Sequence, residues 1–281
     1  MKPIVAVIAP GMMGSVVANR LTDHGLEVRT LLGGRSPATL ARAKAAGMVG
    51  ATDAEIGACD IILSILPPGE ALGLAERLVP VMRAATKKPV YVDCNALAPA
   101  TVLSIARVVE ETGATFVDGG IIGPPPKPDS RNTRIYLSGE AASRAAVLEQ
   151  YGLSMPVQPG PIGAASAMKM SYAGITKGFT ALGAAMMLAS TRAGTADALI
   201  AEMTVSQPLL LGWLTRQMPN MPSKAYRWVA EMEEIAEFVG EDPAGQQFYL
   251  AAARLYERIA ADLEGAQKET AALKAFCAKK G

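Results

Sequence analysis

Short, strongly hydrophobic segments alternate with amphipathic stretches along the first half of the chain, and this alternation restricts the fold more than any other feature. The runs PIVAVI (residues 3–8), DIILSIL (60–66) and PVYVD (89–93) are each followed by a segment with helical periodicity. A continuous apolar run between helices is typical of a strand buried on both faces of a parallel sheet. The sequence therefore predicts an α/β fold with a doubly wound sheet of βαβ units.

Strand signals fade in the second half of the chain. A proline-rich segment, GPPPKPDSRN (123–132), and a last strand-like run, TRIYLSG (133–139), come before a stretch rich in Ala, Met, Ser and Gly at 164–193 that contains no Pro. This stretch predicts one long helix, and the rest of the chain looks all-helical. We expect two domains, a nucleotide-binding domain at 1–160 and an all-α domain at 161–281. The longest uncharged run of this stretch, 178–191, is shorter than the ~20 residues of a membrane span, so no membrane partner is expected.

Composition excludes several classes of function. The chain has 281 residues and a formal net charge of +1, and no basic run points to nucleic acid. Its three cysteines, Cys59, Cys94 and Cys277, are too widely spaced for a disulfide framework, which favours a cytoplasmic location. With His24 as the single histidine, Ser-His-Asp chemistry, a His-rich zinc site and His-based dehydrogenation are hard to build, and no metal is expected. A proton carrier would be Lys, Tyr, Asp or Glu, acting on a small molecule.

The segment VAVIAPGMMG, residues 5–14, is close to a dinucleotide-binding loop. In the G-x-G-x-x-G pattern the glycines permit a tight turn, approach to the pyrophosphate, and close helix–strand packing. Ala9 stands in the first glycine position, while Gly11 and Gly14 keep the other two. The alternative is a β–α turn that binds nothing. Because the loop follows the first predicted strand, we expect its residues to bind a dinucleotide: Ala9, Pro10, Gly11, Met12, Met13 and Gly14.

The residues after the second predicted strand favour NADP over NAD. A carboxylate there would select the ribose 2′-hydroxyl of NAD, but residues 28–52 contain no Asp or Glu. Arg35 and Ser36 stand just past the strand instead, and a guanidinium beside a hydroxyl suits a 2′-phosphate. The alternative is that Arg35 is simply a surface residue. We expect NADP, with NAD possible.

Four separated motifs resemble the β-hydroxyacid dehydrogenase family, which contains the 3-hydroxyisobutyrate and 6-phosphogluconate dehydrogenases. APGMMG is similar to the family's GxGxMG, GRS (34–36) to its NRT-type cofactor selector, LP (66–67) to the LP after its fourth strand, and DCNALAP (93–99) to its DxST…P segment. The resemblance implies a Rossmann-type domain. It also implies that Leu66 and Pro67 lie near the adenine and ribose of the cofactor, and that Asn95, where the family has serine, lies near the nicotinamide.

DGGIIGP (118–124) resembles the substrate loop of the family, D-A-P-V-S-G-G. Asp118 and Gly123 are kept, but Ile122 stands where the family has serine and Pro124 replaces the last glycine. The resemblance implies that Ile122 and Gly123 bind a substrate carboxylate through the backbone. The helical C-terminal region is similar to a short phosphogluconate-dehydrogenase-like type, which implies a homodimer.

Catalysis is expected on the long helix. The family has a glycine-led turn, then a lysine and one turn later an asparagine; Gly163 and Lys169 match, but the asparagine is absent and Tyr172 lies at i+3. Lys169, Tyr172, Thr176 and Lys177 share one face of an α-helix, although lysines on a helix also commonly extend into solvent. For Glu231, Glu234 and Glu237 we expect a solvated charged face; the alternative is that Glu231 or Glu234 closes the site in the second domain.

These residues suggest a division of roles in hydride transfer. Lys169 would exchange the hydroxyl proton, and burial beside Lys177, a substrate-binding residue, would bring its pKa from ~10.4 toward about 7–8. Tyr172 would orient the reacting group, and Asn95 would hold the carboxamide or the reacting oxygen. The leading hypothesis is an NADP-dependent oxidoreductase of a small β-hydroxy acid or related alcohol. The alternatives are an imine or other carbonyl-type reductase and a non-catalytic NADPH-binding protein.

Overall fold

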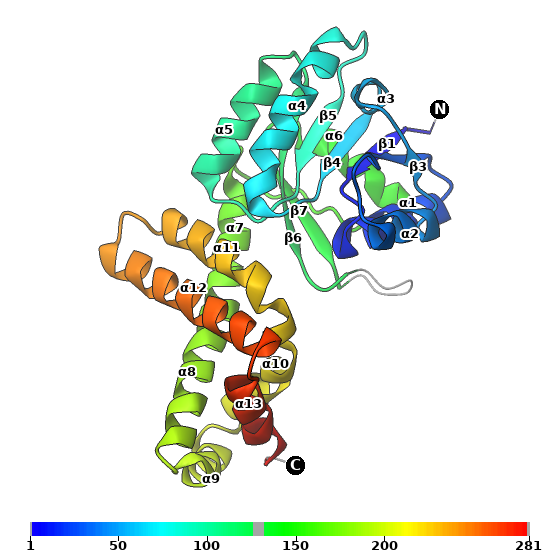
Figure 1. The fold of residues 1–281 in the computed structure, drawn as a ribbon. Coiled ribbons are helices and arrows are strands. Elements are labelled where there is room, and N and C mark those ends of the chain that lie inside the picture. Colours follow the sequence, from blue (N-terminus) through cyan, green and yellow to red (C-terminus); the bar gives the residue numbers. More distant parts are fainter. Residues whose placement is uncertain (1, 126–131, 280–281) are drawn as a thin grey trace. The chain divides into compact units, whose positions relative to one another are not determined.

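The computed structural model describes residues 2–125 and 132–279 and divides the chain into two compact units. Unit 1 is Met1–Met170 and unit 2 is Ser171–Gly281 (Figure 1). The division falls ten residues beyond the expected boundary at 160, because the start of the long helix hydrogen-bonds to unit 1. Part of the predicted proline-rich loop, 126–131, lies outside the described residues.

Unit 1 contains a seven-stranded sheet with helices on both faces. Its strands lie in the order β3-β2-β1-β4-β5-β6-β7, and all neighbours are parallel except β6 and β7. The strands are β1 (Val5–Ile8), β2 (Val28–Thr30), β3 (Val49–Gly50), β4 (Ile61–Ser64), β5 (Val90–Asp93), β6 (Thr115–Ile122) and β7 (Arg134–Ser138). The predicted doubly wound fold is confirmed.

The helices of unit 1 cover the two faces of this sheet. They are α1 (Met12–Asp23), α2 (Pro37–Ala45), α3 (Asp53–Gly57), α4 (Ala71–Ala84), α5 (Pro99–Glu110) and α6 (Ala142–Ala146), with the short turns η1 (Pro68–Glu70) and η2 (Val147–Tyr151). α2 begins as predicted, with the Ser36 side chain accepting from the amide of Thr39 and Pro37 in the first turn. Figure 1 shows α4 and α5 side by side on one face.

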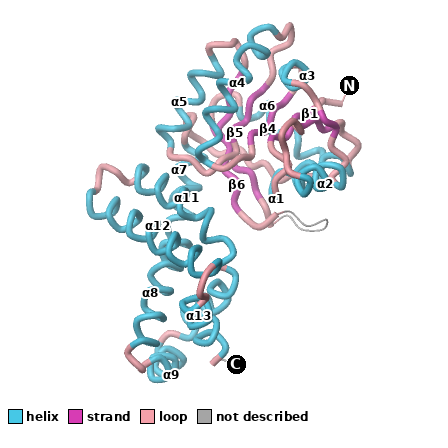
Figure 2. The backbone as a smooth tube through the Cα atoms, viewed as in Figure 1, coloured by secondary structure: helices cyan, strands magenta, loops and turns pink. Residues whose placement is uncertain are grey.

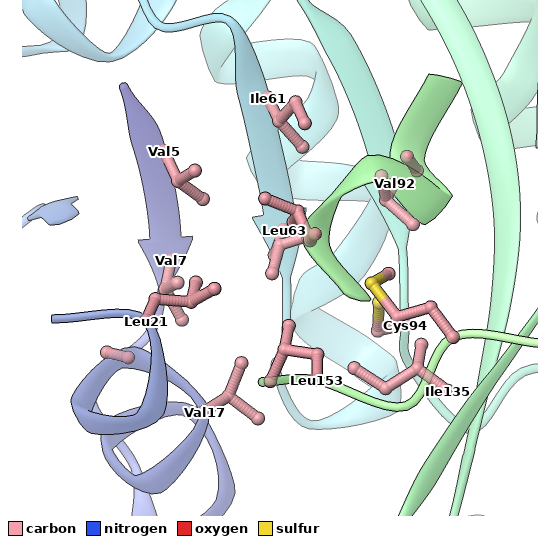
Figure 3. Close-up of a cluster of buried hydrophobic side chains, with 14 of the residues drawn as sticks. Val5, Val7, Val17, Leu21, Ile61, Leu63, Val92, Cys94, Ile135 and Leu153 are labelled. Atoms are coloured by element: carbon pink, nitrogen blue, oxygen red, sulfur yellow. The ribbon is translucent and has the colours of Figure 1, made fainter. Parts of the chain in front are cut away.

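Alternation along the strands produces two separate hydrophobic cores. Val5 and Val7 of β1 pack with Leu63 of β4 and with Val17 and Leu21 of α1 on one face (Figure 3). The intervening Ala6 and Ile8 join α4 and α5 on the other face. Because both sides of β1 and β4 are covered, these strands are continuous apolar runs in the sequence.

Unit 2 contains only helices and connecting loops among its described residues (Figure 2). Its elements are the π-helical segment η3 (Gly174–Gly178), α8 (Phe179–Arg192), α9 (Ala196–Ser206), α10 (Pro208–Gln217), η4 (Met218–Asn220), α11 (Pro222–Phe238), α12 (Pro243–Glu264) and α13 (Lys268–Ala278); α7 (Ala164–Ala173) precedes η3. None of the helices in the described part of the chain combines the length and apolar character needed to cross a membrane.

The predicted long helix is a helical run interrupted by a π-helical turn. A Cβ atom added at Gly174 would lie 2.9 Å from the hydroxyl oxygen of Tyr249, and one at Gly178 would lie 3.1 Å from the same ring. Tyr249 belongs to α12, so the two glycines give this aromatic side chain room against the helix. π-Helical turns are frequent at functional sites.

The cysteines should differ in reactivity in the folded protein. Burial raises the pKa of Cys59 to about 12 and that of Cys94 well above its ordinary value, and Cys277 is half-buried. Because the thiolate is the reacting form, we expect iodoacetamide at pH 8 to modify Cys277 first and to leave Cys59 and Cys94 unmodified. Intact-mass spectrometry before and after denaturation measures this; three rapid modifications in the folded protein would contradict it.

Candidate functional site

The loop between β1 and α1 lies where the strand order reverses. β1 pairs with β2 on one side and β4 on the other, so the chain leaves β1 and β4 toward opposite halves of the sheet. Ligands of doubly wound sheets bind at this point, beyond the carboxyl ends of the strands. The predicted nucleotide loop (residues 9–14) follows β1, and Leu66 and Pro67 follow β4. The fold therefore brings these two predicted cofactor segments to one edge of the sheet.

The two glycines of the loop have different structural environments. A Cβ atom at Gly14 would lie 2.0 Å from the carbonyl oxygen of Ala9, so α1 approaches the end of β1 only because Gly14 lacks a side chain. A Cβ atom at Gly11 would have no atom within 4 Å. Gly11 is also the N-cap of α1 and has no side chain to bond the amides of the first turn. Such a helix start, open above Gly11, fits a pyrophosphate.

The predicted selector residues lie at the start of α2. The Ser36 hydroxyl is the N-cap acceptor for the Thr39 amide at 3.3 Å, and Arg35 is half-buried before it. A second guanidinium, not predicted from the sequence, also reaches this area: Nε of Arg42 donates to the carbonyl oxygen of Pro10 at 3.3 Å, and Nη2 donates to the Thr39 hydroxyl at 2.8 Å. Arg42 therefore joins α2 to the nucleotide loop.

Asn95 joins the ends of β4 and β5. Its side chain is 2% exposed; Oδ1 accepts from the Leu66 amide at 2.5 Å, and Nδ2 donates to Ser64 Oγ at 2.9 Å and to Asp93 Oδ2 at 3.0 Å. Both Nδ2 hydrogens are thus directed at protein oxygens. The predicted contact of Asn95 with a carboxamide or reacting oxygen would require it to give up one of these bonds, whereas its present bonds hold Leu66 and hence Pro67 in place.

Lys169 and the predicted substrate loop meet at the end of β6. The Lys169 side chain is half-buried, and its Nζ donates to the carbonyl oxygen of Ile121 at 2.7 Å, directly before Ile122 and Gly123. Gly123 has a φ of +121°, and a Cβ atom there would lie 2.3 Å from the carbonyl oxygen of Asn132, so only glycine fits this turn. The structure thus places the predicted proton carrier beside the predicted substrate-binding backbone.

The charge of the Lys169 amine also affects the pKa of Cys94, the residue directly after β5. The pKa of the Cys94 thiol is raised by burial first, then by the Asp93 and Asp118 carboxylates, and Lys169 opposes this shift. Lys169 is therefore within electrostatic range of the segment that follows β5. In the described residues, no three His, Cys, Asp or Glu side chains form a group that could hold a metal ion.

Tyr172 and Lys177 belong to unit 2. The Tyr172 side chain is 53% exposed, and its carbonyl oxygen accepts from the Thr176 hydroxyl at 2.9 Å. Lys177 forms an ion pair with Glu231, and its Nζ lies 5.3 Å from the ring centroid of Trp228. The predicted role of Lys177 in substrate binding would require this ion pair to open.

The helix carrying Glu231 differs from the prediction. A solvated face is wrong for Glu231, because its side chain is only 17% exposed and is paired with Lys177. Trp228, three residues before Glu231, was the sequence signal that this face of the helix is covered. Trp228 packs edge-on against Tyr256, whose hydroxyl donates to the Lys177 carbonyl oxygen at 2.5 Å. Burial and the Glu231 charge raise the pKa of Tyr256.

Comparison with known proteins identifies the family. The profile of the family described as the NAD binding domain of 6-phosphogluconate dehydrogenase matches residues 4–152, just over half of the chain. The chain belongs to this family. Residues 191–259 match a domain of unknown function, DUF1932. The resemblance to β-hydroxyacid dehydrogenases and the Rossmann-type N-terminal fold are confirmed. The chain is a short member of that group and has the NAD-binding domain of these oxidoreductases.

Similar proteins include several whose function is not established. An uncharacterized 28.5 kDa protein of Methanothermus fervidus is 28% identical over 198 residues, covering 70% of this chain and 74% of that protein. A conserved protein of unknown function, described as similar in structure to 3-hydroxyacid dehydrogenases, is 28% identical with a TM-score of 0.69 and covers 96% of this chain and 98% of its own.

A characterised enzyme shares the fold. The 3-hydroxyisobutyrate dehydrogenase of Mycobacterium tuberculosis, solved with L-serine, has a TM-score of 0.70 at 20% identity and covers 98% of this chain and 99% of its own. An imine reductase from Myxococcus stipitatus, solved with NAD+, has a TM-score of 0.59 at 21% identity and covers 98% and 99%. At these identities the likeness concerns the fold.

Proposed function

We propose that the protein is an NADP-dependent oxidoreductase that transfers hydride between the nicotinamide and a small β-hydroxy acid or related alcohol. The observation that supports this most is the Lys169 amine, half-buried and 2.7 Å from the carbonyl oxygen of Ile121 at the end of β6. An amine held at the ligand-binding edge of the sheet can exchange a proton with an alcohol beside it. The family of the nucleotide-binding domain supports the cofactor class.

The residues of unit 1 have separate tasks in this proposal. The start of α1 binds the pyrophosphate above Gly11, and Arg35 binds the 2′-phosphate. Asn95 holds Leu66 and Pro67 against the cofactor through its buried hydrogen bonds. When bound, the cofactor would accept the hydride during oxidation and donate it during reduction.

The remaining tasks concern the substrate. Lys169 accepts the hydroxyl proton during oxidation and returns it during reduction, while the carbonyl of Ile121 holds the ammonium form. The backbone at Ile122 and Gly123 receives the substrate carboxylate. The roles of Tyr172 in orienting the reacting group and of Lys177 in binding substrate stay predictions from the sequence, and for Lys177 the ion pair with Glu231 would have to open.

A substrate screen tests the proposed function. Small β-hydroxy acids, the corresponding keto acids and cyclic imines are offered with NADP or NADPH, and in parallel with NAD or NADH, and nicotinamide absorbance is followed. We expect hydroxy-acid oxidation with NADP. Turnover of imines alone would favour the alternative, an imine or other carbonyl-type reductase. The replacement of the family serine by Ile122 is the sequence feature that supports this alternative. Cofactor binding without any turnover would favour a non-catalytic NADPH-binding protein.

Variants of two arginines near the nucleotide loop should distinguish selection of NADP over NAD from stabilisation of the loop itself. We expect Arg35→Ala to weaken NADPH binding about 10–100-fold and leave NADH binding unchanged, because it removes charge-assisted bonds to the 2′-phosphate alone. Arg42→Ala should weaken both cofactors equally, since Arg42 bonds the carbonyl oxygen of Pro10 within the loop. Fluorescence titration with NADPH and NADH measures both. Equal losses in Arg35→Ala would remove its role as selector.

We also propose a homodimer formed through unit 2. Ile175, Leu182 and Met186 are 72%, 47% and 54% exposed at positions 0, 7 and 11 of one helical run, and Val205 and Leu209 are more than 80% exposed. A second copy of the chain would cover such an apolar surface.

Light scattering after size exclusion tests this proposal. We expect the wild-type mass to be about twice 29.2 kDa and a Met186→Glu/Leu209→Glu variant to be monomeric, because two carboxylates would be buried without partners. Leu40→Glu, at an exposed apolar residue of α2 in unit 1, is the matched control and should stay dimeric. A wild-type monomer would contradict the proposal.

A further inference from the structure

Asp118 is a fully buried carboxylate in the middle of β6 that accepts four hydrogen bonds. Its Oδ2 accepts from the Ser138 hydroxyl at 2.9 Å, the Gly163 amide at 2.9 Å and the Ser166 amide at 3.1 Å, and Oδ1 accepts from the Ser166 hydroxyl at 2.6 Å. A buried charge is costly unless hydrogen bonds compensate it, so this arrangement depends on all of these donors.

Three of these donors come from the start of α7, so Asp118 acts as a helix cap supplied by a distant strand. Ser166 is 48 residues from Asp118 along the chain. Ser138 makes a further contact with the same turn of α7, because its hydroxyl oxygen also accepts from the Ala165 amide at 3.0 Å. A carboxylate at a helix N-terminus is favoured by the amide groups and by the helix dipole.

The same strand holds Lys169, one turn further along α7. Ser166 and Lys169 lie at i and i+3 and therefore on one face of the helix. Gly120 of β6 lies between Asp118 and Ile121, which contact these two residues. A Cβ atom at Gly120 would lie 2.8 Å from the Ala165 carbonyl oxygen and 3.2 Å from Cβ of Lys169, so the strand and the helix approach each other closely there. Strand β6 thus contacts this turn of α7 through a carboxylate, a bare glycine and the Ile121 carbonyl.

We infer that Asp118 is a positioning residue for Lys169, acting through the first turn of α7. This inference rests on the proposed function, in which Lys169 exchanges the substrate proton. The carboxylate keeps the turn against β6 and so keeps the amine at the Ile121 carbonyl. Its negative charge should also favour the ammonium form of Lys169, since the carboxylate and the amine both act electrostatically on the same thiol, that of Cys94.

The test measures the amine directly, so that it does not depend on a substrate. The rate of Lys169 acetylation by acetic anhydride is followed by mass spectrometry against pH, with the exposed Lys268 of unit 2 as internal reference. In Asp118→Asn we expect Lys169 to react severalfold faster than in the wild type at pH 7. The amide places N–H groups against the donors of α7, which loosens the turn, and the charge that favours the ammonium is gone.

Two further variants keep the result interpretable. Ser166→Ala removes only the hydroxyl bond, and should raise the acetylation rate less than Asp118→Asn; it serves if Asp118→Asn does not fold. Asp53→Asn, at a half-buried residue of α3 paired with Arg77, is the matched control and should leave Lys169 unchanged. An unchanged rate at Lys169 in folded Asp118→Asn or Ser166→Ala overturns the inference.

Turnover measurements then separate the two proposals. If a substrate is found, Asp118→Asn should lower kcat about 10-fold or more, leave the Kd for NADPH within twofold, and move the kcat–pH profile. If acetylation changes as expected but the wild type turns over no substrate, the proposed function fails while Asp118 still positions Lys169.

Discussion

Lys169→Met is expected to lower kcat by about 10²–10⁴-fold while leaving the Kd for NADPH within about twofold. Methionine has a similar length and cannot exchange a proton. The nucleotide loop and the residues after β2 and β4 keep their own hydrogen bonds in this variant, while the bond of the amine to the Ile121 carbonyl oxygen is lost. Stopped assays with the best substrate of the screen and fluorescence titration with NADPH measure the two quantities.

One comparison variant shows whether charge or proton exchange is lost, and a second tests the ion pair between Lys177 and Glu231. Lys169→Arg keeps a cation that can donate to Ile121, but a guanidinium does not release its proton near neutral pH, so we expect a loss of kcat close to that of Lys169→Met. Lys177→Met removes an ion-pair partner of the partly buried Glu231 and should lower the free energy of unfolding by about 1–3 kcal/mol. Full turnover by Lys169→Met would exclude Lys169 as the proton carrier.

The fold of unit 1 could be predicted because its signal is local. Val5, Val7, Ala6 and Ile8 are all buried, on alternate faces of β1, so the strand is recognisable as an apolar run without knowledge of its neighbours. Strand β3 (Val49–Gly50) lacks this signal, because it is a two-residue edge strand with both residues exposed. It was not predicted.

Apart from the family resemblance, which placed Lys169 in one site with the loop at Ile122 and Gly123, the candidate site was predictable only where residues are adjacent in sequence. The loop with Gly11 and Gly14 is one such segment. The bond from Arg42 to Pro10 joins residues 32 apart, and the ion pair of Lys177 with Glu231 joins residues 54 apart. No periodicity or spacing encodes such contacts, because they depend on which strands and helices become neighbours in the folded chain.

Gly14→Ala and Gly11→Ala should both abolish tight cofactor binding, but for different reasons. At Gly14 the added Cβ atom would lie 2.0 Å from the carbonyl oxygen of Ala9, a backbone atom that cannot move away without displacing β1 or α1. We expect the free energy of unfolding to fall by about 1–3 kcal/mol and NADPH affinity to fall with it. Urea denaturation and fluorescence titration measure the two effects.

Gly11→Ala is the matched variant in the same loop. Its Cβ atom would meet no protein atom within 4 Å, so the free energy of unfolding should stay within about 0.5 kcal/mol of the wild type. The second glycine of the fingerprint is where the backbone approaches the pyrophosphate, so a methyl group there should raise the Kd for NADPH and NADH alike, about tenfold or more. Loss of affinity without loss of stability would place the pyrophosphate above Gly11. If Gly11→Ala binds NADPH as tightly as the wild type, the pyrophosphate lies elsewhere, and the assignment of the loop to the cofactor is wrong.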